Sequence, residues 1–420
     1  MQHSICLVIC YFGRSWPAYF PHFLASCAAN PTVSFLVFTN LAAPPAPPNT
    51  RFVHLPDLAA FNALASRTLG FPVAVTDPYK LCDLKPAYGV IFAEYLASYA
   101  FWGYCDIDLL FGDIRRFLPA PVLDHHDVLS AVAQYPAGFF LLFRNTPAIS
   151  RLFMRSPDYQ RVFQSARHFC FDECNFKFGE LLGAGQLIEE VETEIQSLAH
   201  VLSAQARQGT IRWYGQTLGE EFMLDTTPVV WQPGRVYNTA TQHEFLLVHL
   251  VNVKTNPTFL VEPFRPGAPC YVSARGLTHS PRPTWHTALR VGLLRSRAWA
   301  QRTRWRAWVA LQRARSLVRP ASYPHLDQAC YIIGNLKCTF YFQEKNRYCV
   351  VSDFKGQLGL QQCQVFAAPD GRQVLREAGR ISVLSGSGSA PAETPFKIEI
   401  HNLQTQAREV GYLLHSPASQ

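Results

Sequence analysis

Short apolar runs alternate with helix-like segments through the first 260 of the 420 residues, and this alternation limits the fold more than any other feature. The runs SICLVIC, VSFLVF and RFVHL have the length of buried strands. DLAAFNALASRTLG begins with a capping Asp and ends with Gly, as many helices do. We expect an α/β fold in which helices cover both faces of a sheet. Within it we expect a helical segment at 76–98 with a break near Pro86, a helix at 170–182, and late strands at 229–232 and 245–250 that finish the sheet. In such folds, ligands bind beyond the carboxyl ends of the strands.

The chain changes character after residue 265. No acidic residue lies between Glu262 and Asp327, and this gap holds about a third of the 38 Lys and Arg, so the net charge of +8 belongs to one segment. From about residue 326 the sequence turns to short β-type runs joined by Gly, Asn and Asp. We therefore expect three parts: an α/β domain at 1–265, a basic Arg/Trp-rich linker and helix at 266–325, and a small β-rich domain at 326–420.

Two aspartates follow one of the apolar runs in the stretch WGYCDIDLLFGD. If the strand stays extended through Asp106 and Asp108, both side chains leave the same face and converge on one small object. Adjacent carboxylates repel each other unless a cation lies between them, so the pair indicates a bound metal. The spacing alone is weak evidence, because a chain of this length with 14 Asp contains roughly 0.5 such pairs by chance. Two exposed turn residues are the alternative.

The aspartate pair belongs to a larger set of motifs. These are YKLCDLKPAYG (79–89), WGYCDIDLLFGDIRRFL (102–118), GFFLLFRNTP (138–147), FDE (171–173) and LLVHL (246–250). In order and spacing they resemble bacterial glycosyltransferase-like proteins of polysaccharide biosynthesis, over about residues 3–262. The resemblance implies a glycosyltransferase A-like fold with a Rossmann-like mixed sheet, in which a nucleotide-sugar donor and a divalent metal meet at a DxD motif. It does not reach the basic segment or the β-rich domain.

The resemblance also gives roles to the residues around the metal. Asp108 would bind Mn²⁺ or Mg²⁺ directly, and Asp106 would lie nearer the ribose of the donor. His249 would complete the metal site, because a neutral imidazole suits Mn²⁺. Lys254 would reach a phosphate as a point charge. A core histidine and an exposed lysine are the alternatives for the last two residues.

Asp83 and Lys85 match positions that lie near the nucleotide or the diphosphate in the family. The alternative is a capped helix on which Lys80 and Asp83 pair at the surface. Asp172 and Glu173 match an acidic pair that faces the acceptor, and in an inverting enzyme one of them would be the general base. The alternative is a pair of acids favoured by the first turn of a helix.

One position departs from the family pattern. Relatives often carry a polar residue after the glycine that matches Gly138, whereas this chain has Phe139. Any acceptor contact made there is therefore in doubt.

The amino-terminal run has no basic region before it and no cleavage site after it, and no window has the length of a membrane span. The 12 Cys form no CxxC pair, which fits reduced thiols. We expect a cytoplasmic protein that contacts the anionic inner membrane face through residues 284–319. The alternative is a helix packed between domains. Nucleic acid is not expected, because no nucleic-acid motif accompanies the Arg and Trp residues.

Together these features predict a metal-dependent glycosyltransferase that moves a sugar from a nucleotide-diphosphate donor to a glycan or lipid-linked acceptor. A metal-dependent nucleotidyltransferase would use the same carboxylate chemistry but release pyrophosphate. A non-catalytic glycan-binding protein, with a degenerate α/β domain and a working β-rich domain, is the third hypothesis.

Overall fold

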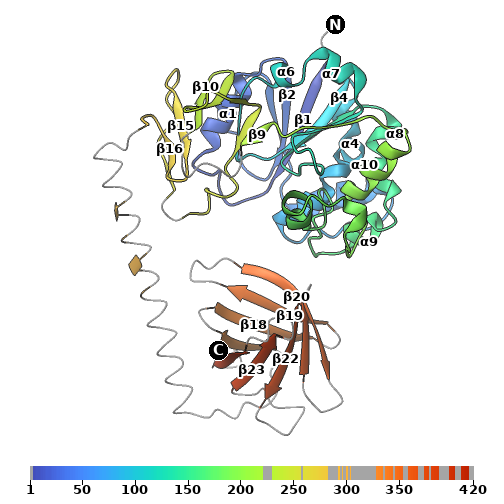
Figure 1. Cartoon of the computed structure of the whole chain (residues 1–420), viewed down its shortest axis with the longest axis vertical. Helices are drawn as coiled ribbons and strands as arrows, with labels where there is room; N and C mark the ends of the chain where they lie inside the picture. The colour runs from blue at the N-terminus through green and yellow to red at the C-terminus, as the bar shows by residue number, and fades with distance from the viewer. Residues whose placement is uncertain are drawn as a thin grey trace. The chain divides into compact units, whose positions relative to one another are not determined.

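The computed structural model describes residues 3–220, 229–256 and 259–281, six residues between 292 and 303, and the backbone of eight strands between 328 and 415 (Figure 1). The chain forms two compact units, Met1–Val291 and Gly292–Gln420. Most of the expected basic helix at 284–319 lies outside the described residues. Among the described residues, no helix has both the length and the apolar character needed to cross a membrane.

The first unit is built on a mixed seven-stranded sheet, which confirms the α/β class. The strand order is β3-β2-β1-β4-β7-β6-β8. Strands β3, β2, β1 and β4 run parallel, and β7 runs antiparallel to both of its neighbours. The strands are β1 (Ile5–Tyr11), β2 (Val33–Thr39), β3 (Thr50–His54), β4 (Phe101–Cys105), β6 (Val128–Ser130), β7 (Phe140–Arg144) and β8 (Trp213–Gly215).

Alternate residues of the central strands face two separate cores. In β1, Cys6 and Val8 belong to one core, whereas Leu7 and Ile9 belong to the other. The first core includes side chains of α2 (Leu58–Leu69), α4 (Tyr88–Ile91) and α10 (Leu198–Arg207), and the second those of α1 (Phe20–Ala28). Figure 1 shows α4 and α10 on one side of the sheet and α1 on the other. Both faces are thus covered, which explains why the central strands are almost wholly apolar.

The local signals in the first hundred residues predict the helices well. Helix α2 begins at the side chain of Asp57, which accepts from the Ala60 amide, and ends at Gly70 with φ 81°. The expected helical segment with a break near Pro86 is a series of short turns: η1 (Pro78–Lys80), α3 (Leu81–Leu84), η2 (Lys85–Ala87), α4 and α5 (Ala93–Leu96). The remaining helices are α6 (Ile114–Phe117), α7 (Ala120–His125), α8 (Pro147–Ser150), η3 (Leu152–Arg155), α9 (Tyr159–Gln164), η4 (Gly179–Gly183) and η5 (Ile188–Glu190).

The helix expected at residues 170–182 does not form. Cys170, Asn175 and Phe176 have φ values of 54°, 52° and 64°, in the left-handed region. A right-handed helix cannot pass through such residues. Only Gly179–Gly183 forms a single helical turn, of the π type.

The late strands do not complete the central sheet, contrary to the expectation for residues 229–232 and 245–250. Strand β13 (Leu247–His249) lies between β5 (Leu109–Phe111) and β9 (Gly219–Glu220) in a three-stranded sheet. Strand β10 (Val229–Gln232) belongs to a six-stranded sheet with β11 (Arg235–Asn238), β12 (Glu244–Phe245), β14 (Leu260–Val261), β15 (Cys270–Ser273) and β16 (Gly276–Thr278). The chain leaves the central sheet at the end of β4, directly before the aspartate pair, so β5 provides a new edge on which β13 pairs.

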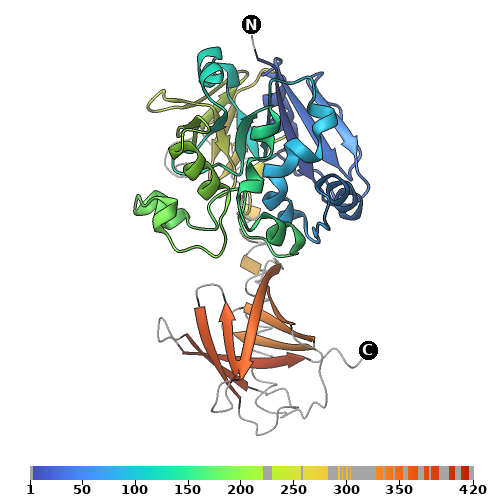
Figure 2. The same ribbon diagram turned by 90° about the vertical axis from the view of Figure 1, so that its right-hand side faces the viewer.

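The second unit contains eight antiparallel strands, drawn from orange to red in Figure 2. Each strand pairs with the next, and the first also pairs with the last, so the sheet closes on itself. The strands are β17 (Gln328–Ile333), β18 (Leu336–Gln343), β19 (Asn346–Ser352), β20 (Leu358–Ala367), β21 (Gln373–Glu377), β22 (Arg380–Gly386), β23 (Lys397–Asn402) and β24 (Arg408–His415).

Candidate metal centre

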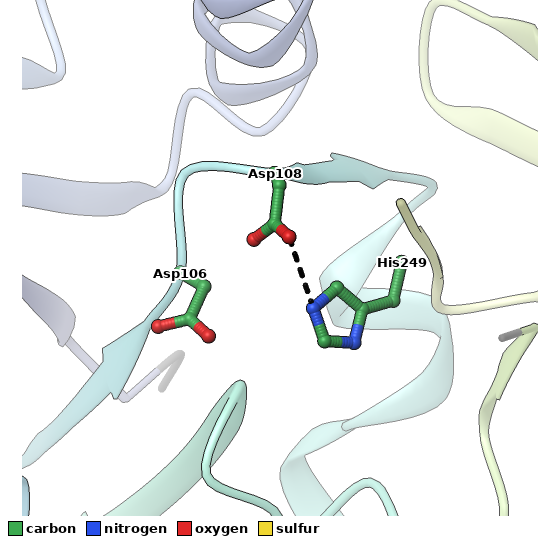
Figure 3. Close-up of side chains that lie close together, drawn as sticks. All are labelled: Asp106, Asp108 and His249. Atoms are coloured by element: carbon green, nitrogen blue, oxygen red, sulfur yellow. Dashed lines mark ion pairs between the residues drawn. The ribbon is translucent and has the colours of Figure 1, made fainter. Parts of the chain in front are cut away.

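The aspartate pair lies where two sheets meet. Strand β4 ends at Cys105, the chain bends through Ile107 and Asp108, and β5 begins at Leu109. The strand therefore does not stay extended through both aspartates. The bend nevertheless directs Asp106 and Asp108 toward the same space, as Figure 3 shows. In β13, His249 is the register partner of Leu109, which places its ring beside Asp108.

These three side chains form a cluster that can bind a metal ion. One ligand atom from each of Asp106, Asp108 and His249 lies within 4.8 Å of the others. A cation that binds its ligands at about 2.1 Å needs them within about 4.2 Å of one another, so small side-chain rotations suffice. Two carboxylates and an imidazole suit a hard or borderline divalent ion such as Mg²⁺ or Mn²⁺.

Asp108 is held as an anion by two basic partners. Its side chain is 2% exposed, and its Oδ2 lies 2.5 Å from Lys254 Nζ and 3.3 Å from His249 Nε2. Burial opposes ionisation, but His249 and then Lys254 outweigh burial and lower the pKa of Asp108 below its ordinary value. Lys254 therefore lies beside the cluster, where the sequence placed a phosphate ligand.

Asp106 has its own cationic partner. Lys85 Nζ donates to Asp106 Oδ1 at 2.6 Å and to the carbonyl oxygen of Gly138 at 2.7 Å. Burial disfavours the charged lysine, but Asp106 outweighs burial and raises the pKa of Lys85 well above its ordinary value. Each aspartate of the pair is thus neutralised by a lysine that comes from a different part of the chain.

Gly138 connects the metal cluster to the acidic pair. Its carbonyl accepts from Lys85, and its amide donates to Glu173 Oε1 at 2.8 Å. A Cβ atom on this residue would lie 2.6 Å from Asp172 Oδ2, so only glycine fits without a shift of the carboxylate. The Asp106 amide also donates to the carbonyl of the next residue, Phe139, at 3.0 Å. The aspartate pair and the acidic pair Asp172 and Glu173 therefore contact the same backbone segment, Gly138 and Phe139, although the two pairs are far apart in sequence.

Asp172 and Glu173 are poorly hydrated carboxyl groups. Asp172 is 2% exposed, and its Oδ1 has no hydrogen-bond partner in the part of the chain that the structure describes. Burial and then the charge of Glu173 raise the pKa of Asp172 well above its ordinary value. Burial also raises the pKa of Glu173, although the Gly138 amide and Lys85 oppose the shift. A carboxyl group with a raised pKa can exchange a proton closer to neutral pH.

Asp83 does not face the site, which corrects its assignment to the nucleotide. The residue is fully buried and receives Lys80 Nζ at 2.7 Å. Its carboxylate also accepts from the amides of Phe169 and Phe171, at 2.9 and 2.7 Å. The ion pair between Asp83 and Lys80 is buried, whereas the capped-helix alternative placed it at the surface. Asp83 thus anchors the segment that leads into the acidic pair.

Sequence reasoning missed two aromatic residues near the cluster, Tyr11 and Tyr19, and did not foresee the contact that Phe139 makes. Tyr11 is the last residue of β1 and Tyr19 directly precedes α1; burial and then Asp108 raise the pKa of Tyr19 above its ordinary value. The Tyr11 ring stacks on Trp16, with centroids 5.2 Å apart. Phe139 is buried, and its ring centroid lies 4.6 Å from that of His249. The departure at Phe139 therefore supports the imidazole and offers no polar contact. Tyr11 and Tyr19 could have been suspected, because β1 ends at the same edge as β4.

No curated protein matches the chain. A search of solved structures finds the galactosyltransferase LgtC in complex with donor and acceptor sugar analogs. The alignment has 13% sequence identity and a TM-score of 0.27, and it covers 58% of this chain and 86% of that one. One family model matches residues 7–263, which is more than half of the chain and includes every residue of the cluster. The chain therefore belongs to DUF6625, a family of unknown function.

Proposed function

We propose that the first unit is a metal-dependent glycosyltransferase with a glycosyltransferase A-like fold. It would move a sugar from a nucleotide-diphosphate donor to a glycan or lipid-linked acceptor. The observation that carries this proposal is the cluster of Asp106, Asp108 and His249 with Lys254 and Lys85 beside it. Ligands for a divalent cation and ammonium groups for phosphate oxygens are what a metal-diphosphate complex requires.

Asp108 and His249 would hold the metal, with Asp106 near the donor ribose. A bound divalent cation would stabilise the negative charge that grows on the departing diphosphate. In the structure the Lys254 ammonium group pairs with Asp108 Oδ2. It would turn from this carboxylate to a phosphate oxygen when the donor binds. Lys85 would hold the Asp106 side chain in position, because the lysine is buried and is also fixed by the Gly138 carbonyl.

The acidic pair would serve the acceptor. In an inverting reaction one carboxylate removes the proton from the acceptor hydroxyl. Both oxygens of Glu173 already have partners, the Gly138 amide and the Cys170 thiol. Asp172 Oδ1 has no partner among the described residues, so we assign the base to Asp172 and a positioning role to Glu173.

Ligand-induced thermal stabilisation tests the donor site, because a ligand that binds only the folded protein raises the melting temperature. The purified chain is heated with UDP, GDP, CDP, ADP or dTDP, with and without Mn²⁺. We expect a shift with one nucleotide that requires Mn²⁺ and disappears in Asp108→Asn. Asp57→Asn is the matched control, since asparagine also caps a helix and Asp57 lies at the start of α2.

Unchanged nucleotide binding in Asp108→Asn would refute the role of the cluster. If none of the nucleotides raises the melting temperature, a degenerate α/β unit and a glycan-binding role for the second unit are favoured. Product analysis separates the remaining alternative, because a nucleotidyltransferase releases pyrophosphate and a glycosyltransferase releases a nucleoside diphosphate.

A further inference from the structure

Two aromatic rings project into solvent beside the acidic pair. Tyr79 is 66% exposed and Phe176 is 50% exposed. Both rings meet the imidazole of His168 edge to face, with centroid distances of 4.7 Å for Tyr79 and 5.3 Å for Phe176. The two residues are nearly a hundred positions apart in sequence, so the fold brings them to one imidazole. We call Tyr79, His168 and Phe176 the aromatic cluster.

The backbone under Phe176 is strained. Phe176 has φ 64° and the preceding Asn175 has φ 52°, a left-handed conformation that is unfavourable for a bulky residue. The Asn175 side chain holds this turn by donating to the Phe169 carbonyl at 2.8 Å and accepting from the Glu194 amide at 2.9 Å. The fold thus tolerates strain in order to expose an apolar ring. Such strain is typical of ligand-binding segments.

The aromatic cluster is fixed to the acidic pair by the same segment. Cys170 and Asn175 bound the turn that contains Asp172 and Glu173, and the Asn175 amide donates to the Cys170 carbonyl at 3.0 Å. Below the cluster, His168 Nδ1 lies 3.1 Å from Asp83 Oδ1. Partial burial, then the Cys82 thiol and the charge of Asp172, raise the pKa of Tyr79. The Tyr79 hydroxyl therefore lies within the electrostatic field of the carboxyl group assigned as the base.

We propose that Tyr79 and Phe176 form the subsite that binds the acceptor sugar, with its ring packed on their exposed faces. This proposal rests on the proposed function, because it needs a hydroxyl to be delivered to Asp172. A pyranose presents C–H groups on its faces and hydroxyls around its rim. Aromatic rings bury the apolar face at little cost in conformational entropy, and the neighbouring carboxylates accept from the rim.

The chemistry of the cluster favours a sugar over the other ligands of such a reaction. The donor nucleotide is assigned to the metal cluster, where Lys254 and Lys85 supply positive charge. A lipid chain would need a wide apolar surface, whereas these two rings flank an imidazole and lie beside carboxyl groups. Exposed aromatic rings beside carboxyl groups match the apolar face and the hydroxylated rim of a sugar ring.

Saturation-transfer NMR on the full chain tests the subsite. The probes are octyl glycosides of glucose, galactose, mannose and N-acetylglucosamine, in the presence of the nucleotide found by thermal stabilisation and of Mg²⁺, which is diamagnetic and leaves the proton signals sharp. We expect transfer to pyranose ring protons in the wild type and at least about a twofold loss in Tyr79→Ala and in Phe176→Ala, since aromatic contacts contribute to binding beyond the area they bury. Leu182→Ala is the matched control, because this exposed side chain follows in the same segment.

Conservative variants separate aromatic stacking from general apolar contact. Phe176→Tyr should keep the ring signals, whereas Phe176→Leu should lose them. Signals confined to the octyl protons would identify a lipid surface and overturn the proposal, as would no ring-proton transfer from any probe to the wild type. Equal ring signals in wild type and alanine variants would overturn it too.

The two proposals fail separately. If nucleotide binding is intact but the ring signals do not depend on Tyr79 and Phe176, the subsite proposal is refuted and the donor-site proposal stands. Ring signals that depend on both residues, in a protein that no nucleotide stabilises, keep the subsite and remove the transferase.

Discussion

Gly138→Ala should destabilise the first unit strongly. The added methyl would lie 2.6 Å from Asp172 Oδ2 and 2.8 Å from Glu173 Cδ, so both carboxyl groups must move. Overpacking of this kind costs about 1–3 kcal/mol. A shift of Glu173 also weakens its bond from the Gly138 amide, and bonds to charged groups contribute about 1.5–3 kcal/mol. Because the two costs overlap, we expect a loss of about 2–4 kcal/mol in the free energy of unfolding.

Thermal unfolding followed by tryptophan fluorescence measures this loss. For domains of this size 1 kcal/mol corresponds to about 2–4 °C, so the midpoint should fall by about 4–16 °C. Gly179→Ala is the control, because no atom lies within 4 Å of its new methyl. In Gly138→Ala/Asp172→Ala the methyl gains room, and the double variant should be more stable than the sum of the single effects predicts. Equal midpoints for Gly138→Ala and Gly179→Ala would refute the reasoning.

Three further substitutions test other parts of the site and its support. Asp172→Asn should stabilise the protein increasingly as pH rises above the ordinary pKa of 3.8, because the folded wild type keeps a proton that the unfolded chain has lost. In urea unfolding from pH 4 to 8, the difference in unfolding free energy between variant and wild type should widen and then level off, and a constant difference would contradict the raised pKa. Lys254→Met should strengthen Mn²⁺ binding by about tenfold without nucleotide, by removing a positive charge from Asp108, and should weaken nucleotide binding, as titration calorimetry can measure. Asn30→Ala should cost about 2–3 kcal/mol, because the buried amide side chain pairs with two carbonyls and one amide; a change below 0.5 kcal/mol in urea unfolding would exclude that role.

The sequence predicted the α/β class and the first strands because these depend on local patterns. Alternate residues of β1 face two helical layers, so the run is apolar throughout, and Asp57 and Gly70 mark both ends of α2. The prediction of a helix at residues 170–182 was wrong, because the positive φ angles there arise from tertiary contacts such as those of Asn175. The prediction that the late strands complete the central sheet was also wrong, because strands that pair across a long stretch of sequence leave no local signal of their partner.

The candidate site was predicted through the types of its residues more than through their contacts. Asp106, Asp108 and His249 do come together, although a bend and not a continuous strand unites them. Asp83 was misplaced because a carboxylate at a helix start looks the same in sequence whether it meets a ligand or backbone amides. The role of Gly138 could not be foreseen, because it depends on which side chains surround a position without a side chain.

The aspartate pair spans two sheets, and this has a mechanical consequence. Asp106 directly follows β4 of the central sheet, whereas Asp108 directly precedes β5 and His249 ends β13, two strands of the three-stranded sheet. The spacing of the metal ligands is therefore set by how two separate layers dock. Trp231 of the six-stranded sheet donates to the Phe111 carbonyl at 2.8 Å and so helps to hold the three-stranded sheet in place, although Trp231 is not part of the cluster. Residues that never touch a ligand would then tune which ion radius the cluster accepts, and selection between metals would be a property of interlayer packing.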